Sequence, residues 1–210
     1  MRAHAGPGVA AWLALGVLLP LLVFALLAAA IGQGPLPFDL PLLGLAHAAG
    51  GGPFDRFWLV VTHIGHEWGV VPVDIGLVAL LVLARRWRSA LFAAIALGGS
   101  GLLNVACKLA FSRLRPELWT SIAPEHNFSF PSGHAMGSMT LAWVLFLLAW
   151  PTRWRWPVAA AMALFVVGVG WSRIHLGVHY PSDILAGWAA ATAWAIAAWL
   201  ATGHARPARA

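Results

Sequence analysis

The sequence predicts an all-α, polytopic integral membrane protein with six transmembrane helices. Of its 210 residues, 60% are hydrophobic and only 10% are charged, and the mean hydropathy is +0.79. Soluble domains are about 45–50% apolar with roughly 25% charged residues, so this composition excludes an ordinary soluble fold. Apolar runs recur along the whole chain with arginines between them. We therefore expect residues 1–210 to form a single membrane-embedded domain.

The first apolar run covers residues 9–31 and follows Arg2, so it resembles a signal peptide at first sight. The apolar part of a signal peptide has about 7–15 residues, whereas a bilayer-spanning helix needs about 20. We interpret this run as a retained first span, with cleavage after it as the alternative.

Five further apolar runs follow, at residues 68–84, 89–110, 134–150, 157–171 and 184–202. The second span is interrupted by Pro72 and Asp74, and residues 57–62 before it form either a short interfacial helix or an extension of the span. Strand patterns are absent from the sequence, and unpaired strands are not viable in lipid.

The basic residues predict the orientation of the spans. With the N-terminus inside, eight of the thirteen positive charges fall on the inner side, and no carboxylate does. This bias fits the positive-inside rule and places both termini in the cytoplasm. The eight inner residues are Arg2, Arg85, Arg86, Arg88, Arg153, Arg155, Arg206 and Arg209.

Five basic residues lie on the outer side, and four of them gather near the ends of the third and fifth spans. Such residues are costly near a membrane and call for an anionic partner that arrives from outside. Nucleic acid is excluded as that partner because the arginines do not form one basic stripe. The five are Arg56, Lys108, Arg113, Arg115 and Arg173.

The segment K-L-A-F-S-R-L-R-P, residues 108–116, holds the first candidate site residues. Lys108 and Arg115 are seven apart, about two helical turns, so they share a face if the helix continues that far. A lysine point charge and an arginine fork suit a tetrahedral dianion. The alternative is a basic cluster that snorkels to the membrane interface.

The segment F-P-S-G-H, residues 130–134, directly precedes the fourth span. A helix N-terminus offers free backbone N–H groups to an anion, Ser132 adds a hydroxyl, and Gly133 permits close approach. His134 can exchange a proton with that anion. The alternative is an ordinary N-cap serine beside an uninvolved histidine.

The segment W-S-R-I-H-L-G-V-H-Y-P-S-D, residues 171–183, allows two interpretations. His175 and His179 have the i,i+4 spacing of a helical metal site, with Asp183 as a third ligand. Alternatively, Asp183 orients one histidine for nucleophilic chemistry while Arg173 supplies charge. Pro181 predicts that Asp183 begins the sixth span with His179 just before it. The anion-suited segments on the same face favour the second interpretation.

These three segments resemble the signature of the type 2 phosphatidic acid phosphatase superfamily of membrane lipid phosphatases. The signature is lysine, six residues and Arg-Pro, then Pro-Ser-Gly-His, then Ser-Arg, five residues, histidine, three residues and aspartate. It is matched without substitution by Lys108…Arg115-Pro116, Pro131-Ser132-Gly133-His134 and Ser172-Arg173…His179…Asp183.

The resemblance implies a metal-independent and cofactor-free hydrolase that forms a phosphohistidine intermediate. His179 would be the nucleophile, Asp183 would orient it, and His134 would protonate the leaving group. Lys108, Arg115, Ser132, Gly133 and Arg173 would hold the phosphoryl oxygens. The substrate would be a lipid phosphate in the bilayer of the inner (plasma) membrane, reached from the periplasmic or outer face. By family analogy, undecaprenyl diphosphate ranks first, followed by phosphatidylglycerol phosphate or phosphatidate.

Three other functions remain as alternatives. A lipid phosphotransferase would use the same site but pass the phosphoryl group to another lipid instead of to water. A vanadate-dependent haloperoxidase has similar motifs, but those enzymes are soluble and six spans argue against one. A non-catalytic anion transporter or lipid-binding protein would not need two histidines and an aspartate together.

The remaining polar residues receive structural interpretations. His63, His66 and Glu67 lack the H-E-x-x-H order of zinc proteases, so we expect a structural role at the interface, with metal binding or lining of the substrate path as alternatives. We expect His175 to pack near the site without a catalytic part. We expect Arg113 to be solvated or to face the lipid headgroups, His126 to be solvated and Cys107 to be buried.

Overall fold

The computed structural model describes residues 8–203, and every regular element in that range is helical. Arg2, Arg206 and Arg209 lie outside the described residues. The elements are α1 (Val9–Leu13), a π-helical turn η1 (Ala14–Leu18), α2 (Leu19–Ala30), a 3₁₀ turn η2 (Ile31–Gln33), α3 (Asp39–Ala48), α4 (Pro53–Ile64), α5 (Val70–Leu83), α6 (Trp87–Phe111), α7 (Gly133–Ala149), α8 (Arg155–His175) and α9 (Pro181–Ala201).

Four helices in this range are long and apolar enough to cross a membrane, and two shorter apolar helices accompany them. The four are Val9–Gln33, Trp87–Phe111, Arg155–His175 and Pro181–Ala201, and the shorter ones are α5 and α7. The predicted spans therefore correspond to six apolar helices, with ends displaced by a few residues. Many large apolar side chains of the first helix face outward, including Leu15 at 67% exposure, as lipid contact requires.

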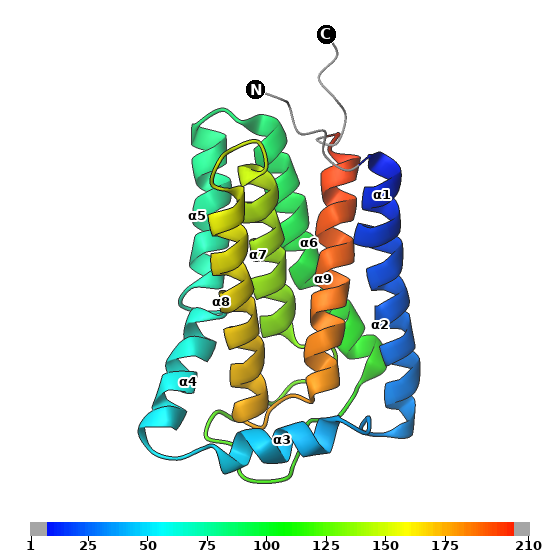
Figure 1. Ribbon diagram of the computed structural model, residues 1–210, viewed down its shortest axis with the longest axis vertical. Helices are drawn as coiled ribbons and strands as arrows, with labels where there is room; N and C mark the ends of the chain where they lie inside the picture. Colours follow the sequence, from blue (N-terminus) through cyan, green and yellow to red (C-terminus); the bar gives the residue numbers. More distant parts are fainter. Residues whose placement is uncertain (1–7, 204–210) are drawn as a thin grey trace.

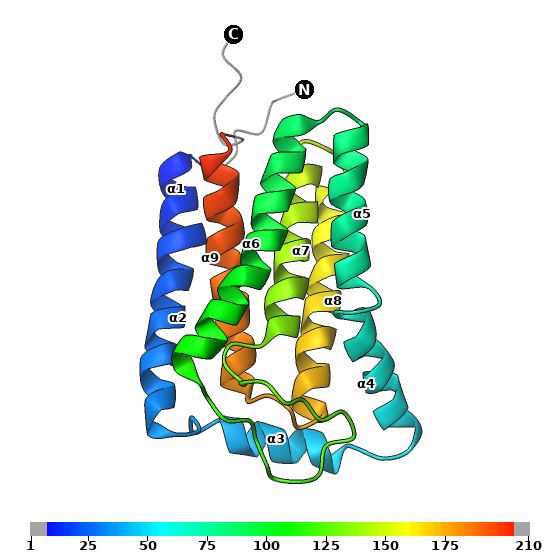
Figure 2. The same cartoon turned by 180° about the vertical axis from the view of Figure 1, so that it is seen from behind.

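Helix α7 lies inside the bundle, between α6, α8 and α9, and the first long helix packs along α9 (Figures 1 and 2). The contact between α7 and α9 is close because Gly187 has no side chain. A Cβ there would lie 3.0 Å from the carbonyl oxygen of Ser132 and 3.0 Å from Cβ of Ala135. Small residues allow membrane helices to approach in this way, and the contact sets the first turn of α7 against α9.

Two short helices, α3 and α4, cover one end of the bundle (Figure 1). Helix α4 decides between the two alternatives for the residues before the second span: it is a separate helix, longer than residues 57–62. Helix α3 was not predicted, because its ten residues are too few to span a bilayer and its sequence has only two polar side chains, Asp39 and His47.

The basic residues separate between the two ends of the bundle. The α5–α6 and α7–α8 connections, which carry Arg85, Arg86 and Arg153, lie at the end away from α3 (Figures 1 and 2). The 112–132 segment lies beside α3 at the opposite end and carries Arg113 and Arg115. The distribution agrees with the sidedness that the sequence predicts.

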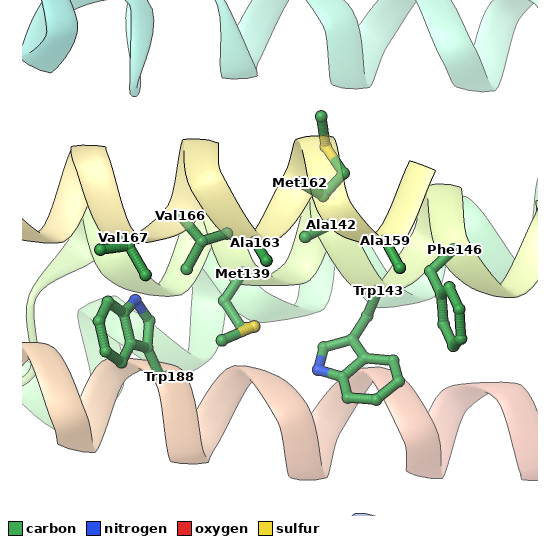
Figure 3. Close-up of a pocket in the computed structure, with 10 residues that line it drawn as sticks. All are labelled: Met139, Ala142, Trp143, Phe146, Ala159, Met162, Ala163, Val166, Val167 and Trp188. Atoms are coloured by element: carbon green, nitrogen blue, oxygen red, sulfur yellow. The ribbon is translucent and has the colours of Figure 1, made fainter. Parts of the chain in front are cut away.

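An apolar cavity of about 320 Å³ lies between α7, α8 and α9. Figure 3 shows Trp143 and Trp188 on its α7 and α9 sides, with Val166 and Val167 of α8 opposite. None of the ten side chains that line it is ionisable. The candidate chemistry must therefore lie elsewhere.

Candidate active site

The three motif segments meet at the α3 end of the bundle. Lys108 is in the last turn of α6, residues 132–134 open α7, Arg173 is in the last turn of α8, and Asp183 is in the first turn of α9. Arg115 follows α6 in the 112–132 segment, which crosses this end (Figure 2). The fold thus brings residues that are up to 75 positions apart in the chain, from Lys108 to Asp183, to the same end of the bundle.

His179 and Asp183 form a buried pair at the start of α9, with side chains 1% and 0% exposed. Pro181 occupies the first turn, and Asp183 Oδ2 accepts the backbone N–H of Tyr180 at 2.9 Å. The same oxygen lies 3.4 Å from His179 Nδ1. The prediction that Asp183 begins the sixth span with His179 just before it is therefore confirmed.

The environment of His179 selects one tautomer. Arg115 Nη1 lies 3.0 Å from His179 Nε2, and a guanidinium can only donate hydrogen bonds. Nε2 must therefore carry the lone pair, and Nδ1 the proton that faces Asp183. Burial, followed by the cations of Arg115 and Arg173, lowers the pKa of His179 well below its ordinary value. At neutral pH the ring is neutral, as a nucleophile requires.

Arg113 is buried against two carboxylates, which corrects the expectation of a solvated or headgroup-facing charge. Its side chain is 8% exposed, with Nη1 2.5 Å from Asp183 Oδ1 and Nη2 3.3 Å from Asp39 Oδ2. The reason is local: α6 ends at Ser112 in a left-handed conformation, φ 46°, and the chain then turns inward. Ser129 Oγ also donates to Asp183 Oδ2, so Asp183 is held from three sides.

The end of α6 also changes the relation between Lys108 and Arg115. The sequence predicts a shared helical face only if the helix continues through both, and α6 stops at Phe111. The two side chains meet instead through Asn127 of the 112–132 segment. Lys108 Nζ donates to Asn127 Oδ1 at 2.7 Å, and Arg115 Nε donates to the Asn127 carbonyl at 2.8 Å.

Glu125 is a site residue that the sequence analysis missed. Its carboxylate accepts from Arg115 Nη2 at 2.5 Å and from Arg173 Nη2, so it bridges two of the predicted phosphate-binding cations. Burial raises the pKa of Glu125, but the cations of Arg173 and Arg115 outweigh it and lower the pKa below the ordinary value. The sequence did contain a signal for this role. Buried cations need a carboxylate partner, and residues 112–132 contain only two carboxylates, Glu117 and Glu125.

Arg173 is 2% exposed and is held by two partners. Besides Glu125, its Nη1 donates to Thr62 Oγ1 of α4 at 2.6 Å. Its Nε is buried and has no hydrogen-bond partner among the residues that the structure describes. This N–H is therefore a donor that remains available to a ligand.

Helix α7 begins directly after Ser132, as the sequence predicts, and Ser132 has the N-cap role that the alternative interpretation gave it. Ser132 is the N-cap, and its Oγ accepts the backbone N–H of Ala135 at 3.4 Å, while its own N–H donates to the Asp183 carbonyl at 3.1 Å. Gly133 and His134 occupy the first turn. This turn and Lys108 line one cavity of about 270 Å³, with Glu125 on its wall, which we call the phosphate cavity.

The histidines before α5 divide into two kinds. His66 lies against His134, with ring centroids 4.8 Å apart, and lines the phosphate cavity. His63 instead stacks on Trp68 at 4.4 Å, and its Nδ1 is 3.6 Å from Glu67. His66 therefore fits the alternative of a residue on the substrate path, whereas His63 fits a structural role. His126 is exposed, as predicted.

His175 is engaged with α4. Its Nε2 lies 2.8 Å from Asp55 Oδ1, and its ring meets the edges of Phe54 and Trp58. This pairing agrees with a histidine that packs near the site. Within residues 8–203, no three His, Cys, Asp or Glu side chains are grouped so that they can hold a metal ion.

Comparison with known sequences and structures points to one family. The sequence model described as the PAP2 superfamily matches residues 89–207. A phosphatidylglycerophosphatase B of Bacillus subtilis is 31% identical over 132 residues, which cover 60% of this chain and 64% of that protein. An undecaprenyl-diphosphatase of Sulfolobus acidocaldarius is 29% identical over 164 residues, 75% of each chain.

The fold comparison agrees. The crystal structure of a transmembrane PAP2-type phosphatidylglycerolphosphate phosphatase from Bacillus subtilis covers 90% of this chain and 97% of its own, with a TM-score of 0.79 and 25% identity. The crystal structure of Aquifex aeolicus LpxE covers 79% of this chain and 96% of its own, with a TM-score of 0.65 and 24% identity. The second likeness concerns the fold alone.

Proposed function

Because this chain belongs to the PAP2 superfamily, we propose that it is a single-domain membrane lipid phosphatase that hydrolyses lipid phosphates or diphosphates through a phosphohistidine intermediate. The observation that carries the proposal is the arrangement around His179. A buried, neutral imidazole directs the lone pair of Nε2 toward Arg115, at the same place where Arg173 and Glu125 meet.

The cations supply the electrostatic part of the reaction. A transferring phosphoryl group carries charge on three oxygens, which fixed donors stabilise. Arg115 and Arg173 are already paired with the carboxylate of Glu125. Like a phosphate, this group is negatively charged and accepts hydrogen bonds through its oxygens. Lys108, Ser132 and the backbone N–H of Gly133 complete the set. Substrate binding requires Glu125 to release the two arginines.

In the first half-reaction His179 Nε2 attacks phosphorus, and the bond from phosphorus to the leaving oxygen breaks. His134 donates a proton to that oxygen, so the lipid leaves as an alcohol or, from a diphosphate, as a monophosphate. Asp183 stabilises the proton on Nδ1 as the ring becomes positively charged. In the second half-reaction neutral His134 takes a proton from water, and the hydroxide attacks the phosphohistidine. Inorganic phosphate leaves, and His179 regains its neutral form.

Six apolar helices and the separation of basic residues support a multi-pass protein of the inner (plasma) membrane with cytoplasmic termini and the site on the outer face. Undecaprenyl diphosphate is the first candidate substrate, and phosphatidylglycerol phosphate or phosphatidate the second. The names of the matched relatives include both kinds of activity.

The test is phosphate release by the purified protein from lipid monophosphates and diphosphates in the presence of EDTA. We expect activity to persist in EDTA and His179→Ala to lose at least about a thousandfold in kcat. His63→Ala, a histidine stacked on Trp68, is the matched control and should retain activity. Full activity of His179→Ala, or loss of wild-type activity in EDTA, would contradict the proposal.

A further inference from the structure

A second cavity, of about 390 Å³, adjoins the phosphate cavity and extends between α5, α6 and α7. The two cavities share three lining residues, His66, Asn104 and Gly133. Figure 2 shows why space exists there: α6 runs obliquely, close to α5 where a short turn joins them and away from it at the α3 end. The second cavity therefore lies directly beside the place where a bound phosphate would meet its leaving group.

Asp74 lines this second cavity from α5 and has no structural explanation. Its Oδ1 is buried without a hydrogen-bond partner among the described residues. A carboxyl group inside an apolar helix costs several kcal/mol in lipid, and such groups ordinarily pair with another group or serve a site. None of the described residues that line the cavity donates to Oδ1, so this oxygen is free to accept a hydrogen bond from a ligand.

Asn104 offers a second acceptor from the opposite wall. Its Nδ2 donates to the Pro131 carbonyl at 3.0 Å and lies 3.3 Å from Met136 Sδ, which fixes the amide orientation. Its Oδ1 therefore faces Gly133, 3.0 Å from where a Cβ of that residue would be. None of the described residues donates to this oxygen.

Further polar groups continue the wall. Ser100 lies one turn from Asn104 on α6, and Lys108 lies one turn further toward the site, so the three share a face of the helix. Thr140 Oγ1 of α7 and Ser100 Oγ are 2.8 Å apart and satisfy each other. An isoprenoid or acyl chain alone would offer no hydrogen-bond donor to Asp74 or Asn104, and a buried acceptor without a donor is costly.

We propose that this second cavity is a leaving-group subsite, in which a hydroxyl on the alcohol portion of the lipid phosphate donates a hydrogen bond to Asp74, while Asn104 offers an acceptor to a further donor between Asp74 and the phosphate cavity. A carboxyl group offers an acceptor oxygen whether or not it is protonated. The inference rests on the proposed phosphatase function and narrows its substrate class. It reverses the family-based ranking of the candidate substrates, because it favours phosphate esters of hydroxyl-bearing, glycerol-type alcohols over undecaprenyl diphosphate, whose alcohol portion has no second hydroxyl.

The test compares two synthetic substrates that differ in one hydroxyl, a 1-alkylglycerol 3-phosphate and its 2-deoxy analogue, in detergent micelles. A site that hydrogen-bonds a substrate hydroxyl rejects the analogue that lacks it, so we expect wild-type kcat/KM to favour the hydroxyl substrate by about tenfold or more. Asp74→Leu should bring this ratio close to one, whereas Ile75→Leu should keep the wild-type ratio. Asp74→Asn keeps one acceptor oxygen and should keep part of the preference.

Hydrolysis of the deoxy substrate is the folding control within each variant, and Ile75→Leu, at a side chain 67% exposed on the same helix, is the matched control. A wild-type ratio of one, or an unchanged ratio in Asp74→Leu, overturns the subsite while leaving the phosphatase proposal intact. If neither substrate is hydrolysed and no lipid diphosphate is either, the proposed function fails, and the subsite fails with it.

Discussion

Glu125 Oε2 lies 2.5 Å from Arg115 Nη2, so a carboxylate of the chain itself holds a cation that the first motif contributes to the candidate active site. Through its other oxygen Glu125 also holds Arg173. The carboxylate keeps the two guanidinium groups paired, and under the proposed function a substrate phosphate competes with it for them. The depressed pKa of Glu125 means that this competitor is charged at neutral pH.

Glu125→Gln should strengthen the binding of phosphate-like anions. The substitution removes the negative charge but keeps the size of the side chain, and a charge-assisted contact of about 1.5 kcal/mol corresponds to about tenfold in affinity. We expect the inhibition constant of orthovanadate to fall by about that factor. Glu117→Gln, an exposed carboxylate of the same segment, is the control and should leave the constant unchanged. An unchanged or higher constant in Glu125→Gln would refute competition.

Arg113→Ala should destabilise the protein strongly. The substitution leaves Asp39 and Asp183, both 0% exposed, with uncompensated charge, and breaking a buried ion pair from one side costs about 3–5 kcal/mol. The midpoint of thermal unfolding in detergent should fall clearly, and turnover should fall with it because Asp183 loses a support. Arg56→Ala, at an exposed basic residue of α4, should change the midpoint little. Equal midpoints for the two variants would show that the Arg113 pairs contribute nothing.

The pH dependence of kcat/KM should keep its acidic limb well below pH 6.5. The folded-state pKa of His179 is lowered, so the nucleophile stays neutral until the pH falls through that lower value. Arg115→Gln removes the second-largest cause of the shift, after burial, and should move the limb upward while reducing kcat/KM. An acidic limb at or above pH 6.5 in the wild type would contradict the assignment of His179 as nucleophile.

The same shift has a consequence for stability. Above pH 6.5 His179 is neutral in both the folded and the unfolded state and contributes no pH dependence. Below pH 6.5 the unfolded chain binds the proton first, so the free energy of unfolding falls as the pH is lowered toward the folded-state pKa. His179→Gln should weaken this acid sensitivity when unfolding midpoints are compared between pH 7 and pH 5. An identical pH dependence in the variant would argue against a buried neutral His179.

His175→Ala should separate stability from catalysis. The ring is pinned to Asp55 and packed against aromatic side chains of α4, so its removal should lower the unfolding midpoint. A measurable fraction of wild-type kcat should remain, because His175 touches none of the proposed phosphate-binding groups in the described structure. Complete loss of kcat in a folded His175→Ala protein would show that His175 takes part in catalysis.

The sequence by itself determined the helical membrane class, the positions of the apolar helices and the set of motif residues. Lipid imposes these features locally, since twenty apolar residues and flanking arginines must behave as a span wherever they occur. Motif spacing within the first turn of a helix is also local, which is why the relation of His179 to Asp183 was predicted correctly. Helix α3 was not predicted because ten residues with only two polar side chains give neither a spanning length nor a clear helical periodicity.

Only the tertiary structure decided the partners of the charged residues. Arg113 finds Asp39 and Asp183, and Arg173 finds Glu125, through contacts between residues up to 74 positions apart. Oδ1 of Asp74 finds no partner among the described residues. Spacing in the chain cannot predict such pairs, because they depend on where α6 ends and how the 112–132 segment folds back. The same long-range packing shapes the cavity beside Asn104, and with it the chemistry of the lipid that the site can accept.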